Sequence, residues 1–82
     1  MPRKVVLYSQ MGCLFCTKVK EYLSHEHVSF VDRDITLDPS AISELQKLGF
    51  MTTPVTVIAG MVIVGFDQRK LSEALNLEKS GT

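Results

Sequence analysis

Residues 4–16 read KVVLYSQMGCLFC: an apolar run, a turn segment with a glycine, and two cysteines with two residues between them. The β-branched and aromatic run predicts a strand over residues 4–8, and the turn segment, residues 9–12, predicts a loop. From Cys13 onward, apolar residues recur at intervals of three and four, as they do on one face of a helix. The stretch therefore predicts a strand, a loop and a helix over residues 13–25, and the first turn of this helix holds both thiols.

Residues 28–32 and 38–49 predict a second strand and a second helix. Residues 28–32 alternate with the period of a strand. Because a helix joins the two strands, we expect them to lie parallel in one sheet with the helix on its face. Asp38 and Pro39 suit the start of the second helix, and Gly49 suits the position just after its end. The side chains expected on the buried face of this helix are Ile42, Leu45 and Leu48.

Residues 55–58 and 62–64 are two short apolar runs joined by a glycine-containing turn, and they predict a β-hairpin. Asp67 suits the N-cap of a last helix whose inner face carries Leu71, Ala74 and Leu75. The resulting order is β-α-β-α-β-β-α, with both cysteines at the first helix. This pattern predicts an α/β thioredoxin fold, with a four-stranded mixed sheet and three helices, in a single domain over residues 1–82.

Composition narrows the range of functions. Nine Lys and Arg residues balance nine Asp and Glu residues in this 82-residue chain, so no nucleic-acid partner is expected. No apolar run approaches the roughly 18 residues of a membrane span or the core of a signal peptide. We therefore expect a cytoplasmic protein without a membrane partner. A monomer is expected as well, since no long apolar stripe is apparent.

Cys13 and Cys16 are the only cysteines. A disulfide between them would close too short a loop to add much stability, and in a reducing compartment this spacing is typical of redox chemistry or metal binding. The helix N-terminus and the N–H groups of Phe15 and Cys16 would stabilise a Cys13 thiolate, with weak help from Lys18 or Lys20. Cys13 is then expected to attack a disulfide, and Cys16, one turn further in, to resolve the mixed disulfide.

The residues also bear on two further points, metal binding and the peptide bond before Pro54. Zinc is a rival because a C-x-x-C pair is half of a four-ligand site, but His25 and His27 follow Cys16 too closely for common zinc-finger spacing. They are more typical of solvated histidines in a turn, and no metal site is predicted. The peptide bond before Pro54 is trans by the general frequency of such bonds.

With these motifs in order, residues 4–76 resemble the glutaredoxin family, especially the branch that includes the small redoxin that reduces ribonucleotide reductase. The resemblance rests on Cys13-Leu14-Phe15-Cys16, Gly49-Phe50, Thr53-Pro54-Val55, Ile58-Ala59-Gly60 and Gly65-Phe66-Asp67. It implies a cis Pro54 facing the redox pair, and a Thr53 backbone that pairs with a bound thiol peptide. The substrate-binding or glutathione-binding residues that it implies are Gln10, Phe15, Thr53, Pro54, Gly65, Phe66 and Asp67.

Several positions depart from the pattern of glutathione-using members. Leu14 replaces the usual proline, and Gln10 stands where a lysine often meets a glutathione carboxylate. Residues 64–68 keep one glycine and one acid of the family's Gly-Gly-x-Asp-Asp. The remaining acid, Asp67, suits either a helix cap alone or a helix cap that also contacts a ligand. Phe66 suits either an apolar rim around the thiol, shared with Phe15, or ordinary core packing.

The resemblance and the cysteine pair together favour a thiol–disulfide oxidoreductase without a bound cofactor. Its substrates would be protein disulfides, with ribonucleotide reductase among the candidates, or glutathione-mixed disulfides. Its electron donor is left open between glutathione and thioredoxin reductase. The alternatives are an iron–sulfur cluster carrier, because some glutaredoxins hold a cluster between two protomers, and a redox-inert adaptor in which the Cys13 thiol has an ordinary pKa.

Overall fold

The computed structural model describes residues 5–80, with side chains described for residues 5–76, and contains seven elements in the predicted order. They are β1 (Val5–Ser9), α1 (Leu14–His25), β2 (Val31–Asp34), α2 (Pro39–Lys47), β3 (Val55–Ile58), β4 (Met61–Val64) and α3 (Gln68–Ser80). Lys4, the expected start of the first strand, lies outside the described residues. No helix in the described part of the chain is both long enough and apolar enough to cross a bilayer.

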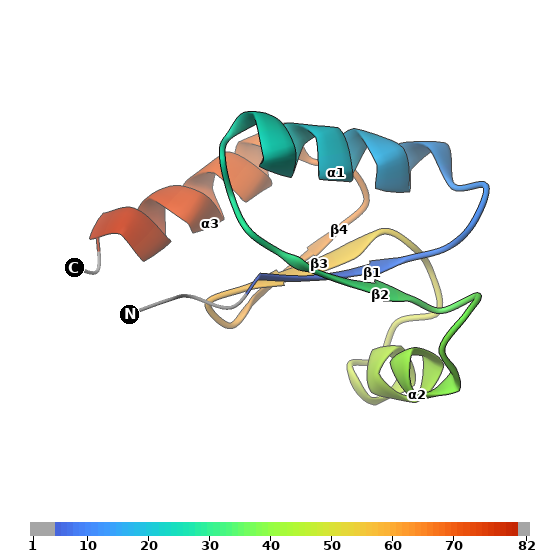
Figure 1. Cartoon of the computed structure of the whole chain (residues 1–82). Coiled ribbons are helices and arrows are strands. Elements are labelled where there is room, and N and C mark those ends of the chain that lie inside the picture. Colours follow the sequence, from blue (N-terminus) through green and yellow to red (C-terminus); the bar gives the residue numbers. More distant parts are fainter. Residues whose placement is uncertain (1–4, 81–82) are drawn as a thin grey trace.

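The four strands form one mixed sheet in the order β2-β1-β3-β4. β1 runs parallel to β2 and antiparallel to β3, and β3 runs antiparallel to β4. The helices α1 and α3 cover one face of the sheet, and α2 covers the other (Figure 1). This arrangement is the thioredoxin fold that the sequence predicts.

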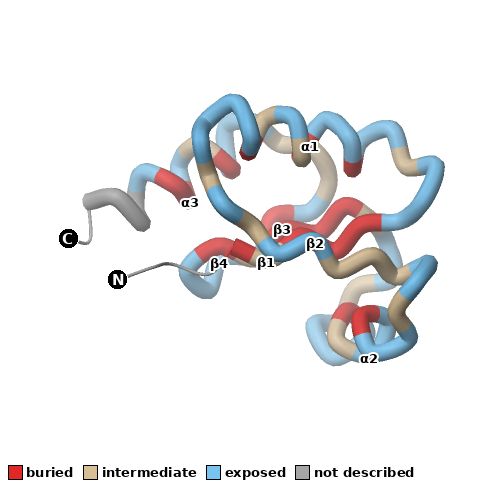
Figure 2. Tube along the Cα trace, viewed as in Figure 1, coloured by how far each residue is buried: buried red, intermediate tan, exposed pale blue. Residues whose placement is uncertain are grey.

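A hydrophobic cluster lies on each face of the sheet, and the buried residues concentrate on its central strands and on the inner sides of the helices (Figure 2). Because successive side chains of a strand point to opposite faces, Val5 and Leu7 lie on the face covered by α1 and α3. Tyr8 lies on the face covered by α2. Burying each large apolar side chain contributes about 1.5–3 kcal/mol. The sheet is therefore packed on both faces, and the loop that leads to Cys13 starts at the end of its buried strand β1.

The second strand begins at Val31, three residues later than predicted. The end of α1 accounts for this shift: the His27 N–H donates to the Ser24 carbonyl oxygen, and the Val28 N–H donates to that of Leu23. This is the Schellman motif, in which His27 takes the left-handed position at φ 57° that glycine usually fills. The Val28 N–H is used at this helix end, and the Val28 side chain packs against the core outside the sheet.

The buried face of α2 confirms the prediction at Leu45 and corrects it at Ile42 and Leu48. Ala41 and Leu45, one turn apart, are buried, whereas Ile42 and Leu48 are each 39% exposed. The predicted ends of the helix are confirmed: Asp38 is the N-cap and accepts from the Ser40 N–H at 3.0 Å, and Gly49 follows the C-cap at φ 89°. The small side chain of Ala41 is therefore part of the contact between α2 and the sheet.

A polar cluster joins α2 to the sheet beside that contact. Arg33 on β2 donates twice to the carboxylate of Glu44, at 3.2 and 2.6 Å, and once to Asp38 at 3.0 Å. Tyr8 on β1 donates its hydroxyl to Glu44 at 3.0 Å. The hydrogen bonds from Arg33 and Tyr8 hold the pKa of the Glu44 carboxyl below its usual value. Burial and the nearby Glu44 carboxylate raise the pKa of Tyr8.

Candidate active site

Cys13 and Cys16 form a disulfide at the start of α1. Cys13 is the N-cap residue, with extended backbone at φ −88° and ψ 110°, and its Sγ accepts the N–H of Cys16 at 3.1 Å. Cys16 is 2% exposed and faces the core, whereas Cys13 is only partly buried. The sequence predicted that the N–H groups of both Phe15 and Cys16 would point at this sulfur. In the structure the Cys16 N–H bonds to it, and within the described residues the Phe15 N–H does not.

The loop before Cys13 is tied to the segment between β2 and α2. Met11 donates its N–H to Thr36 Oγ1 at 3.0 Å, and Ile35 donates its N–H to the Ser9 carbonyl oxygen at 2.8 Å. Thr36 is itself held because its N–H donates to Asp34 Oδ1 at 2.8 Å. Sequence reasoning missed Thr36. The signal available for it was the Asp34-x-Thr36 spacing, which is typical of an Asx turn.

The segment before β3 lies against the cysteine pair. The Thr53–Pro54 peptide bond is cis, as the family resemblance implies and contrary to the general preference for trans. Pro54 is fully buried, and the Thr53 hydroxyl lies 3.8 Å from Cys13 Sγ and 3.4 Å from Gln10 Oε1. Gln10 and Thr53 are thus brought together with Cys13, and Pro54 follows Thr53 in the chain.

The turn between β4 and α3 is joined to the same segment. Gly65 donates its N–H to the Pro54 carbonyl oxygen at 2.8 Å. Asp67 accepts the N–H of Lys70 at 3.1 Å, so its predicted role as a helix cap is confirmed. Phe66 packs against the core and makes an edge-to-face contact with Tyr22, with ring centroids 6.4 Å apart. Phe66 is thus half-buried and packed, whereas Phe15 is largely exposed.

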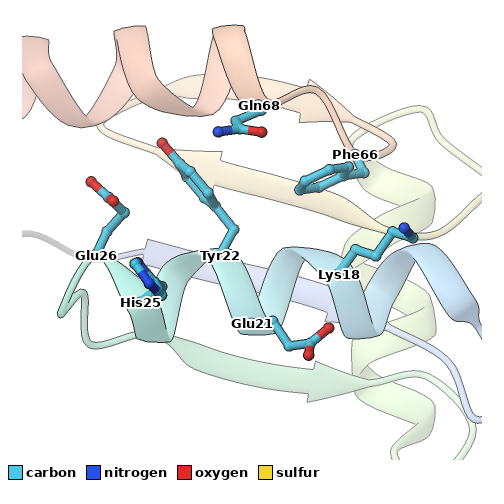
Figure 3. Close-up of a pocket in the computed structure, with 7 residues that line it drawn as sticks. All are labelled: Lys18, Glu21, Tyr22, His25, Glu26, Phe66 and Gln68. Atoms are coloured by element: carbon cyan, nitrogen blue, oxygen red, sulfur yellow. The ribbon is translucent and has the colours of Figure 1, made fainter.

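An open groove runs beside this aromatic pair, between α1 and the start of α3 (Figure 3). Its lining residues are Lys18, Glu21, Tyr22, His25, Glu26, Phe66 and Gln68. Neither cysteine lines it. Lys18 therefore belongs to the wall of this groove, next to Phe66 in the view of Figure 3.

The second lysine expected to assist the thiolate is engaged elsewhere. Lys20 pairs with Asp32 on β2 at 2.7 Å, and Ser9 donates its hydroxyl to the same carboxylate. Burial alone would raise the pKa of Asp32, but the hydrogen bonds from Lys20 and Ser9, together with the charge of Lys20, lower it below the usual value. Lys20 thus connects α1 to β2.

Four large apolar side chains are exposed on the two segments that carry Cys13 and Thr53. Leu14 and Met51 are 79% and 80% exposed, and Met11 and Phe15 are more than half exposed. We call Met11, Leu14, Phe15 and Met51 the apolar collar. Each of them lies within two residues of Cys13 or Thr53 along the chain, and exposed apolar side chains are available to contact another macromolecule.

The two histidines stay at the surface. His25 and His27 are both exposed, as predicted. Among the residues with described side chains, no three His, Cys, Asp or Glu residues come together in a way that could hold a metal ion.

A cysteine pair at the N-terminus of the first helix, next to a cis-proline segment in this fold, defines a thiol–disulfide oxidoreductase. Comparison with known proteins gives the particular family. The model of the glutaredoxin family matches residues 5–63, and the chain belongs to this family.

Three proteins that are similar to this chain in sequence or in fold agree with this assignment. A glutaredoxin-like 8.6 kDa protein in the rubredoxin operon of Clostridium pasteurianum is 32% identical over 72 residues, which cover 87% of this chain and 96% of that protein. The crystal structure of the thioredoxin-like protein BC3987 superposes with a TM-score of 0.81 at 34% identity, covering 85% of this chain and 97% of that chain. The NrdH-redoxin of Escherichia coli shares the fold, with a TM-score of 0.79 at 20% identity over 85% of this chain and 92% of that chain.

Proposed function

We propose that this protein reduces disulfides of other proteins, with Cys13 as the nucleophile and Cys16 as the resolving thiol. The observation that carries the assignment is the asymmetry of the pair. Cys13 is the more accessible sulfur and receives the Cys16 N–H at 3.1 Å, whereas Cys16 is buried behind it. A donor aimed at one sulfur favours the anion at that sulfur, and the anion is the attacking species.

The reaction follows from this arrangement. The Cys13 thiolate attacks one sulfur of the substrate disulfide, so that a Cys13–substrate bond forms, the substrate S–S bond breaks, and the leaving thiolate takes the electron pair. Cys16 then loses its proton to solvent and attacks Cys13 Sγ, which releases the second substrate thiolate and forms the Cys13–Cys16 disulfide. The two electrons that the pair loses are those that the substrate gains, and the released thiolates take up protons from water.

The apolar collar supports a protein as the substrate. Glutathione is small and charged, and it offers little surface to cover four exposed apolar side chains. We propose that the substrate chain contacts the collar and that its backbone pairs with that of Thr53, next to the Gly65–Asp67 turn. Ribonucleotide reductase, which the family resemblance suggests, is the first such protein to assay.

Thioredoxin reductase is the electron donor in this proposal. Gln10, at the position where glutathione-using relatives often carry a lysine, brings no positive charge for a glutathione carboxylate. The NrdH-redoxin of Escherichia coli is described as a glutaredoxin-like protein with a thioredoxin-like activity profile, which fits the same choice.

Parallel assays of the oxidised protein test the donor. One contains NADPH and thioredoxin reductase, the other NADPH, glutathione and glutathione reductase, and both follow the loss of NADPH in the presence of a disulfide-bonded protein. We expect turnover with thioredoxin reductase and none above background with glutathione. Turnover with glutathione alone would overturn the choice of donor, and turnover with neither would overturn the proposed reaction.

A further inference from the structure

The hydroxyl hydrogen of Thr53 has two possible acceptors beside Cys13. Thr53 Oγ1 lies 3.8 Å from Cys13 Sγ and 3.4 Å from Gln10 Oε1. A threonine hydroxyl carries one hydrogen, so a full hydrogen bond to one acceptor weakens the bond to the other. The sulfur and the amide oxygen therefore compete for it.

The stronger acceptor changes with the redox state of the pair. In the disulfide, Cys13 Sγ is neutral and a weak acceptor, so the Gln10 oxygen holds the hydrogen. In the reduced, deprotonated protein the sulfur is charged, and a hydrogen bond to a charged acceptor is roughly twice as strong as a neutral one. Transfer of the hydrogen to the sulfur breaks the hydrogen bond to the Gln10 oxygen, and this loss opposes formation of the thiolate.

We propose that Gln10 tunes the reactivity of Cys13 by competing with its thiolate for the single hydroxyl hydrogen of Thr53. Thr53 is then a catalytic residue, because its hydroxyl touches the reacting sulfur, and Gln10 is a positioning residue that acts through Thr53. The inference rests on the proposed role of Cys13 as the nucleophile. It gives Gln10 a role that requires no bound glutathione.

The groups around Cys13 leave the stabilisation of its thiolate to neutral donors. The donors within reach of its sulfur are the Cys16 N–H and the Thr53 hydroxyl, and no charged side chain in the described part of the chain bonds to it. On α1, Lys20 is paired with Asp32 and Lys18 lines the groove of Figure 3. At the start of α3, the Asp67 carboxylate accepts a backbone N–H.

The test measures the rate of iodoacetamide alkylation against pH in a Cys16→Ser background, where Cys13 is the only thiol. Thr53→Val removes the hydroxyl, and we expect it to move the midpoint of the rate profile up by about one pH unit, a tenfold change in the ratio of thiolate to thiol. Thr53→Ser keeps the hydroxyl and is expected to match the parent. An unchanged midpoint in Thr53→Val, or an equal shift in both variants, would overturn the role of Thr53.

A second pair of variants tests the competition itself. Gln10→Met removes the acceptor from an exposed position without adding charge, and it is expected to lower the midpoint. In a Thr53→Val background the same change is expected to have no effect. An unchanged midpoint in Gln10→Met, or an equal shift in both backgrounds, would refute the competition. A parent midpoint at the ordinary thiol value of about 8.5 would instead count against Cys13 as the activated nucleophile.

Discussion

The N–H of Cys16 points at the Sγ of Cys13 across 3.1 Å, from inside the first turn of α1. Because this donor belongs to the helix backbone, we expect it to stay in place when the disulfide opens. The same turn keeps the Cys16 side chain in the core. One piece of local geometry therefore gives the two sulfurs different chemistry.

Selective alkylation of the reduced protein follows from this asymmetry. At neutral pH we expect iodoacetamide to modify Cys13 at least tenfold faster than Cys16, because Cys13 is both more accessible and more stabilised as an anion. Mass spectrometry of peptides after a short exposure measures the ratio. The same experiment in urea is the control, and there the two rates are expected to converge. Faster modification of Cys16 in the folded protein would reverse the assigned roles.

The apolar collar predicts that large and small substrates respond differently to one substitution. Met51→Gln is expected to raise KM for a protein disulfide severalfold and to leave the rate with a small disulfide unchanged, because only a large partner covers the collar. Met61→Gln is the matched control: Met61 pairs with Ile58, and Ile58 with Val5 at the opposite end of β1 from Cys13. Equal effects of the two variants would contradict a docking role for the collar.

The observed orientation of α2 predicts unequal costs for two neighbouring truncations. Leu45 is 3% exposed and Ile42 is 39% exposed. We expect Leu45→Ala to lower the free energy of unfolding by about 2–4 kcal/mol, and Ile42→Ala to lower it by less than about 1 kcal/mol. Urea unfolding followed by circular dichroism measures both. A larger loss for Ile42→Ala than for Leu45→Ala would contradict the observed orientation of the helix.

The Glu44 cluster predicts a loss of stability in acid. The pKa of Glu44 is held below its ordinary 4.5, first by Arg33 and then by Tyr8. A carboxyl with a lowered pKa in the folded state stabilises the fold above its unfolded pKa, and this contribution is lost as pH falls through the folded value. The free energy of unfolding is therefore expected to decrease below pH 4.5, and Glu44→Gln to flatten the decrease.

Urea unfolding across this pH range provides the measurement. Glu73→Gln is the control, because the pair between Glu73 and Arg69 is highly exposed and such pairs contribute little. Identical pH profiles for Glu44→Gln and the unmodified protein would contradict the role of this carboxylate in stability.

The order of elements could be predicted because its signals are local. Asp38 and Asp67 cap the helices that follow them, and Gly49 ends α2, all within one turn of the residues they act on. The predicted start of β2 was wrong because His27 takes a left-handed conformation, which a histidine in the sequence does not indicate. Sequence periodicity also favoured large side chains on α2, so the buried Ala41 was missed.

The details of the site depend on contacts between distant residues. Thr53 lies 40 residues from Cys13 in the chain, and Thr36 lies 25 residues from Met11. The family resemblance pointed to Thr53 and Gln10 as site residues. The contact between the Thr53 hydroxyl and the Gln10 oxygen, however, depends on how the two segments align at the end of the sheet. Such an alignment has no signature in a single sequence.

Trapping of a mixed disulfide tests the central claim most directly. Cys16→Ser is incubated with a disulfide-bonded protein, quenched with acid and analysed by non-reducing electrophoresis and peptide mass spectrometry, with Cys13→Ser as the paired variant. The account predicts a covalent adduct joined through Cys13 in the first variant, and no adduct and no turnover in the second. An adduct formed through Cys16 in the Cys13→Ser variant, or the absence of any adduct in Cys16→Ser, would contradict Cys13 as the nucleophile.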